Sequence, residues 1–116
     1  MKEDKIIANL LVGSNIINMV CKDIADNKTS REINELLIEE ISELIKAVMK
    51  LERYNMCDKS LRCTYHEIYD NIYEELADVI IMICQFIYKN KLSQQNLIDA
   101  ISIKIIRYYE TISDKK

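Results

Sequence analysis

The chain contains no proline and only one glycine, Gly13, among its 116 residues. Proline and glycine form most turns, bulges and loops, so a chain almost without them has few places where regular structure is interrupted. Helix is the only regular structure that such a sequence favours along its whole length. Hydrophobic residues make up 49% of the chain, which is enough for one buried core at this length. We therefore expect residues 1–116 to form a single all-α domain.

Apolar residues recur three or four positions apart in four segments, which is the spacing of helices with one buried face. The expected helices span about residues 5–26, 30–53, 65–90 and 94–112. Val20 and Ile24 are expected on the buried side of the first helix. Cys21 and Cys84 lie within apolar stripes and are expected to be small core residues.

Polar residues at the predicted helix starts are typical N-caps. Thr29 or Ser30 is expected to cap the second helix, and Ser93 the fourth. Thr64 and Glu67 stand three apart in a capping-box pattern, which predicts that the third helix begins at about residue 65. The polar, aperiodic segment 55–63 is expected to be a loop between the second and third helices.

Short connections between helices favour antiparallel neighbours, so the expected architecture is a four- to five-helix antiparallel bundle. The last helix is more apolar than one small bundle requires, because Ile103 and Ile106 lie off its main stripe. Either a tighter intramolecular core or a buried interface between copies of the chain explains this excess. We favour the interface, and expect a homodimer or homotetramer.

Charge and composition argue against several kinds of partner. The formal net charge is −3, and the sixteen lysines and arginines are scattered without a basic block, so nucleic acid is not expected as a partner. The longest apolar run, residues 79–84, is too short to cross a bilayer, and the N-terminal segment lacks a cleavage-site pattern. Four cysteines without a secretory signal indicate reduced thiols and a cytoplasmic protein.

One acidic pattern occurs twice, on the second and third predicted helices. Glu40 and Glu43 stand three residues apart, as do Glu75 and Asp78, so each pair shares one helix face. On a helical wheel both pairs border the apolar stripe on the same side and at the same phase. Four carboxylates in one groove would repel each other unless a hard divalent cation with oxygen ligands compensated them. From periodicity alone, a metal site and a solvated acidic face both remain open.

The other candidate functional residues are supported less strongly by the sequence. His66 is the only histidine, and its spacing from Cys57 and Cys63 fits no common zinc framework, so a surface histidine is the better interpretation. Lys46 and Lys50 follow the first acidic pair at helical spacing. They are either phosphate contacts, partners that steady the acids, or an ordinary surface charge ladder; Lys50 shares the phase of Glu43 and is the stronger candidate.

The segments 39–50 and 74–85 resemble MazG and, more broadly, the all-α nucleoside triphosphate pyrophosphohydrolases, which include dimeric dUTPases and dCTPases. The family pattern is Glu-x-x-Glu on one helix and Glu-x-x-Asp on the next, and the resemblance covers roughly residues 33–88. It implies Mg²⁺-dependent cleavage of an NTP or dNTP to the monophosphate and pyrophosphate, with Mn²⁺ able to substitute. The connection between the motifs is slightly longer than usual, and the extra length falls in the 55–63 loop.

The resemblance also implies roles for individual residues. The expected ligands of Mg²⁺ are Glu40, Glu43, Glu75 and Asp78. Glu40 or Glu43 would orient or deprotonate the attacking water. The expected contacts to substrate, water or a second metal are Glu39, Glu74 and Gln85. Lys46 and Lys50 join them as candidate substrate contacts from their spacing alone. Two alternatives remain: a non-catalytic helical interaction module with solvated acidic faces, and a degenerate family member that binds nucleotide without turnover.

Overall fold

The computed structural model describes residues 15–114, and within that range the chain is entirely helical apart from its connections. The helices are α2 (Asn15–Asp26), α3 (Ser30–Asn55), α4 (Tyr65–Lys89) and α5 (Gln94–Asp114). The all-α class predicted from the sequence is confirmed. The part of the first expected helix before residue 15 lies outside the described residues.

Capping boxes begin both long helices. The Thr29 hydroxyl accepts a hydrogen bond from the Glu32 N–H at 3.1 Å, and the Glu32 carboxylate accepts one from the Thr29 N–H at 3.2 Å. Thr64 and Glu67 form the same reciprocal pair at the start of α4, both at 3.2 Å. Ser93 accepts a hydrogen bond from the Asn96 N–H at 3.1 Å at the start of α5. The predicted N-caps are confirmed, with Thr29 rather than Ser30 capping α3.

The two long helices end without glycine. Cys57 follows the C-cap of α3 with φ 57°, and Lys91 follows the C-cap of α4 with φ 55°. Helices often end with one residue in this left-handed region, usually glycine, because a Cβ atom there costs roughly 1–2 kcal/mol. The only glycine of this chain is Gly13, so cysteine and lysine occupy these positions instead.

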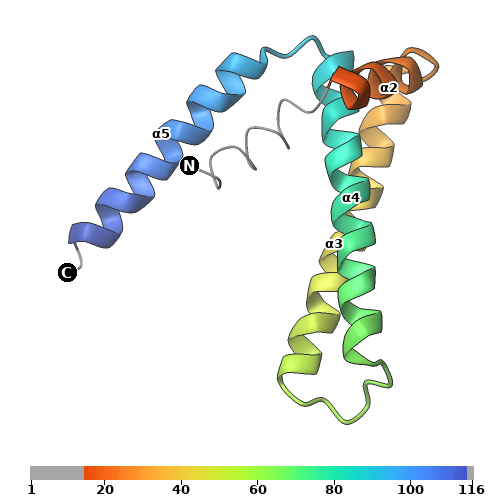
Figure 1. The fold of residues 1–116 in the computed structure, drawn as a ribbon, viewed down its shortest axis with the longest axis vertical. Helices are drawn as coiled ribbons and strands as arrows, with labels where there is room; N and C mark the ends of the chain where they lie inside the picture. The colour runs from red at the N-terminus through yellow and green to blue at the C-terminus, as the bar shows by residue number, and fades with distance from the viewer. Residues whose placement is uncertain (1–14, 115–116) are drawn as a thin grey trace.

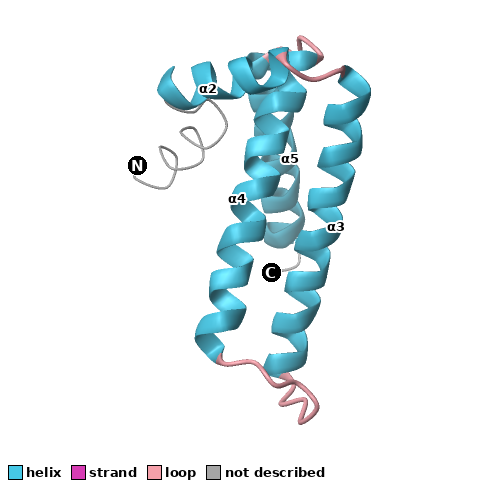
Figure 2. Ribbon diagram, turned by 90° about the vertical axis from the view of Figure 1, so that its right-hand side faces the viewer, coloured by secondary structure: helices cyan, strands magenta, loops and turns pink. Residues whose placement is uncertain are grey.

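An antiparallel hairpin of α3 and α4 forms the body of the molecule (Figures 1 and 2). Helix α2 crosses one end of this hairpin and packs against α4. Ala25 and Ile33 are fully buried there, and Met82 of α4 is nearly so. Partly buried apolar side chains surround this cluster: Leu36, Leu37 and Phe86.

The buried side of α2 differs from the prediction. Val20 and Ile24 are 51% and 37% exposed, whereas Cys21 and Ala25 are buried. Small side chains allow α2 to approach α4 closely, and the branched residues beside them then point away from the contact. The prediction for Val20 and Ile24 was therefore wrong, and that for Cys21 is confirmed. Cys84 is half-buried.

Helix α5 stands apart from the hairpin. It leaves the end of α4 and runs away from α3 and α4 at an angle (Figure 1). None of its described residues is buried, although it carries a series of isoleucines and tyrosines. Within residues 15–114, no helix combines the length and apolarity needed to span a membrane.

Candidate metal centre

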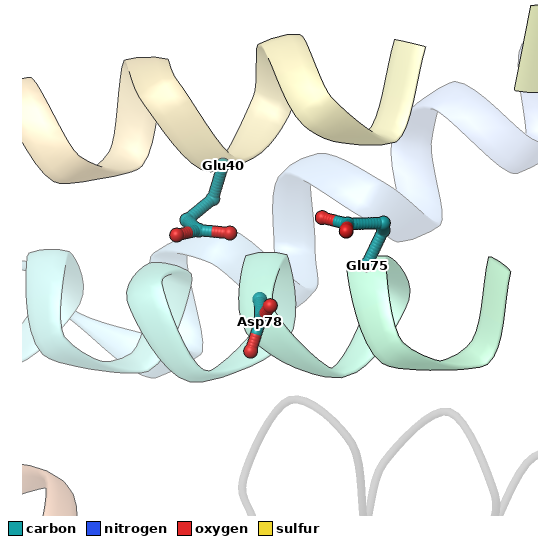
Figure 3. Close-up of side chains that lie close together, drawn as sticks. All are labelled: Glu40, Glu75 and Asp78. Carbon is teal, nitrogen blue, oxygen red and sulfur yellow. The ribbon is translucent and has the colours of Figure 1, made fainter. Parts of the chain in front are cut away.

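Three of the four predicted acids meet in the seam between α3 and α4. Glu40 extends from α3 toward α4, and Glu75 extends from α4 toward α3 (Figure 3). Asp78 lies one turn after Glu75 on α4. One carboxylate oxygen from each of the three lies within 4.8 Å of the others. The matched phases of the two acidic pairs in the sequence therefore correspond to a convergence in space.

Local packing explains why these acids point into the seam. Ala47 lies two turns after Glu40, on the same face of α3, and is buried. On α4, Ile68 and Val79 flank Glu75 on the buried face. The apolar neighbours fix the rotation of both helices, so Glu40 and Glu75 become half-buried while Asp78 stays exposed at the rim.

The electrostatics of the group are unfavourable without a cation. Burial raises the pKa of Glu40 above its usual 4.5, and the charges of Asp78 and Glu75 raise it further. Burial also raises the pKa of Glu75, and the charges of Asp78 and Glu43 add to the effect. Within the described part of the chain, the buried Glu75 Oε2 atom has no hydrogen-bond partner. A buried carboxylate oxygen without a donor is costly, and a cation is one ligand that would satisfy it.

The donor set suits a hard divalent cation. All three side chains offer carboxylate oxygens, which Mg²⁺ and Mn²⁺ prefer over sulfur or nitrogen ligands. Mg²⁺ usually binds to one or two carboxylates and keeps several waters, which leaves positions for substrate phosphates. In residues 15–114, these three are the one group of histidine, cysteine or acidic side chains close enough to share an ion.

Glu43 is placed outside the three-acid group. Its Oε1 atom lies 3.2 Å from Lys46 Nζ, in an ion pair between residues three apart on α3. Its charge still raises the pKa of Glu75, so it remains close to the site. A helical wheel gives the direction of Cα–Cβ but not the rotamer, which explains why the sequence did not distinguish Glu43 from Glu40.

The remaining predicted residues surround this group at different depths. Glu39 and Glu74 are exposed, and Lys50 is half-buried. Gln85 is only 2% exposed, and its Oε1 atom accepts a hydrogen bond from Lys28 Nζ at 3.5 Å. Lys28 was not singled out from the sequence, because a lysine in a polar turn carries no periodic signal.

Two cavities lined by cysteines lie away from the acids. One, of about 240 Å³, lies between α2 and α4 and is lined by both Cys21 and Cys84. The other, of about 450 Å³, lies beside the 55–63 loop and is lined by Cys57 and Cys63. His66 is exposed near this loop, with its ring 5.7 Å from that of Tyr65. Neither cavity includes an acid of the seam.

Comparison with known proteins identifies one family. A family model described as MazG nucleotide pyrophosphohydrolase domain matches residues 28–112, which include all of α3 and α4 and most of α5. No curated protein and no solved structure matched the chain. The matched region contains the whole three-acid group.

Proposed function

Because the chain belongs to the MazG nucleotide pyrophosphohydrolase family, we propose that it hydrolyses a nucleoside triphosphate to the monophosphate and pyrophosphate with the help of Mg²⁺. Glu40, Glu75 and Asp78 are the proposed ligands. The observation that carries the proposal is their convergence within 4.8 Å across the seam, where a buried oxygen of Glu75 has no partner among the described residues. Mn²⁺ could replace Mg²⁺ because it accepts the same oxygen ligands.

The ion, when bound, would offset negative charge on the phosphates and lower the pKa of a bound water. The protein's own contribution is positioning. Glu40 and Glu75 project from two helices whose buried faces fix their orientation. Such preorganisation matters for phosphoryl transfer, because the reaction depends on alignment and electrostatics more than on covalent catalysis.

We assign the water-activating role to Glu43. Glu43 lies outside the three-acid group and forms an ion pair with Lys46, so it is not one of the proposed ligands of the ion. In the proposed step, the water oxygen bonds to the α-phosphorus while the bond from that phosphorus to the bridging oxygen breaks. Glu43 accepts the water proton and pyrophosphate leaves. Glu40 is the alternative base, since it lies in the three-acid group itself.

Supporting roles are proposed for the residues around the group. Lys50 is half-buried on α3 and carries a positive charge suited to phosphate oxygens. Lys46 is the partner that holds Glu43, and Gln85 lies deeper along α4 beside Lys28. Glu39 and Glu74 are exposed next to the ligands, where they would position water or a second ion.

Pyrophosphate release from a panel of NTPs and dNTPs with Mg²⁺ tests the proposal. We expect turnover of at least one substrate by the natural sequence, and a loss of at least about 100-fold in Glu75→Gln, because the amide keeps the shape but not the charge. Glu52→Gln on the exposed face of α3 is the matched control and should retain full activity. If the folded protein releases no pyrophosphate from any substrate, the chain is a binding module or an inactive family member instead.

A further inference from the structure

Helices α2 and α4 carry two cysteine thiols that meet where the helices pack together. Cys21 of α2 is only 4% exposed, and Cys84 of α4 is half-buried. Both line the cavity of about 240 Å³ between these helices, and their thiols lie close enough to share a hydrogen bond. Two side chains that are far apart in the sequence are therefore neighbours in space.

Two hydrogen bonds hold this part of α2 against α4. The Tyr88 hydroxyl donates one to Asp26 Oδ1 at 2.8 Å, and Lys89 Nζ donates the other to the carbonyl oxygen of Ala25 at 3.3 Å. Ala25 lies one turn after Cys21, and Tyr88 lies one turn after Cys84. The neighbouring turns of both helices therefore keep the two thiols together.

The side chains near this pair do not suit a structural zinc ion. Such an ion is held by four cysteine, histidine or acidic ligands. In the part of the chain that the structure describes, neither Cys21 nor Cys84 belongs to a group of three such side chains close enough to share an ion. Two thiols in contact without a third ligand are instead the arrangement from which a disulfide forms.

We propose that Cys21 and Cys84 form a modification site, at which hydrogen peroxide oxidises the two thiols to a disulfide that joins α2 to α4. The cavity has room for this oxidant, because a single water needs only about 10–15 Å³ of such volume and hydrogen peroxide is about twice as large as water. Because the thiols are already in contact, only a small further approach brings the sulfur atoms to the bonding distance of about 2.05 Å.

The reaction has two steps. Cys84 is the more exposed of the two, so its thiolate attacks one peroxide oxygen; an S–O bond forms and the O–O bond breaks. The departing hydroxide takes the proton that the Cys84 thiol has released. The Cys21 sulfur then attacks the sulfur of the Cys84 sulfenic acid, the S–O bond breaks, and the leaving hydroxide departs as water with the Cys21 proton. Two thiols and one peroxide give one disulfide and two waters, so the peroxide oxygens gain the two electrons that the sulfur atoms lose.

The surroundings of the pair determine how it reacts. Burial raises the pKa of the Cys84 thiol, and the Cys21 thiol beside it raises that pKa further. The thiolate is the reactive form, so Cys84 reacts more slowly than an ordinary exposed thiol. Once the sulfenic acid has formed, however, Cys21 is already beside it. The disulfide is therefore favoured over further oxidation of Cys84.

The disulfide would close a loop that contains all of α3 and most of α4. A cross-link stabilises a fold mainly by restricting the unfolded chain, and more so when the loop is long. We therefore expect oxidation to raise the Tm by at least about 5 °C. Neither cysteine belongs to the three-acid group, so this site can be tested without nucleotide or divalent ion and stands apart from the proposed hydrolase activity.

Peptide mapping of the full chain by mass spectrometry, after treatment with excess hydrogen peroxide and alkylation of the remaining thiols, tests the proposal. We expect a peptide pair joined through Cys21 and Cys84 in protein with the intact mass of one chain, 13.7 kDa. Dithiothreitol should reverse both this link and the rise in Tm. A variant with Cys57→Ser and Cys63→Ser should keep both results, because these cysteines line the other cavity.

Cys84→Ala is the matched variant for the thermal measurement. It should keep the helical circular dichroism of the natural sequence but show no rise in Tm with peroxide. Absence of the Cys21–Cys84 link in folded, peroxide-treated protein would overturn the proposal. A link that forms only after the chain is unfolded in urea would also overturn it, as would a rise in Tm that persists in Cys84→Ala.

Discussion

Replacing Glu40 with glutamine should stabilise the protein in the absence of divalent ions, although it should destroy the proposed metal site. Glu40 lies within 4.8 Å of Asp78 and is half-buried in the seam. Two like unit charges at this distance repel by about 1 kcal/mol in water and about 3–4 kcal/mol at an effective dielectric of 20. Because Asp78 is exposed, solvent screens the repulsion between the two carboxylates. We therefore expect Glu40→Gln to raise the free energy of unfolding by about 1 kcal/mol, the lower of these two values.

The pH dependence of this gain follows from the raised pKa of Glu40. A carboxyl group whose folded pKa lies above its unfolded value stabilises the fold at low pH, when it is protonated in both states. This contribution is lost as the pH rises through the folded pKa. The difference between Glu40→Gln and the natural sequence should therefore be small below pH 4.5 and should grow above it.

Thermal unfolding with EDTA, at low salt, measures this effect. At pH 7 we expect Glu40→Gln to unfold about 5 °C higher than the natural sequence, because 1 kcal/mol shifts the Tm of a domain of this size by roughly 4–8 °C. Mg²⁺ should raise the Tm of the natural sequence but not that of the variant. Glu52→Gln on the same helix is the control and should change neither value. A Glu40→Gln variant that is less stable than the natural sequence at pH 7 would refute the account of repulsion in the seam.

Four further predictions follow from individual contacts. Saturating Mg²⁺ at 100 times its Kd should stabilise the natural sequence by about 2.7 kcal/mol in thermal unfolding, and EDTA should reverse the shift. Thr64→Ala should cost about 1 kcal/mol in urea unfolding, because it removes the acceptor that caps α4. Lys91→Gly should add about 0.5–1 kcal/mol in the same assay, because Lys91 has a left-handed backbone that glycine adopts without strain. Hydrogen bonds from Ser60 and Arg53 lower the pKa of Asp58 from 3.8 to about 2. The contribution of Asp58 to stability is therefore present above pH 3.8 and is lost as the pH falls toward 2. When stability is measured against pH, Asp58→Asn should remove the loss of stability between these two pH values.

The sequence predicted the helices well because their boundaries are chemically marked. Thr29 and Thr64 each satisfy free N–H groups at a helix start, and a chain with no proline offers no competing break within the helices. The convergence of Glu40, Glu75 and Asp78 was predicted for a similar reason. Helical phase depends only on residue number, and the apolar stripes showed which side of each helix would face its neighbour.

What the sequence did not predict depends on rotamers and on contacts between elements. Glu43 follows Glu40 by three residues, just as Asp78 follows Glu75, so the sequence gives both the same position in their motifs. In the structure, however, the Glu43 side chain pairs with Lys46. Val20 and Ile24 were expected in the core because they are large and apolar. The smaller Cys21 is buried instead, where α2 packs closely against α4. Hydrophobicity shows that a residue prefers burial but does not identify the surface that buries it.

Binding of Mn²⁺, followed by electron paramagnetic resonance, tests the central claim most directly, since the free ion gives a strong signal that weakens when it is bound. The natural sequence should remove at least one Mn²⁺ per chain from solution, and Mg²⁺ should displace it. Glu75→Gln should lose this binding while keeping its helical circular dichroism, and Glu52→Gln should keep both. Equal binding by Glu75→Gln and the natural sequence would show that the acids of the α3–α4 seam do not hold the ion.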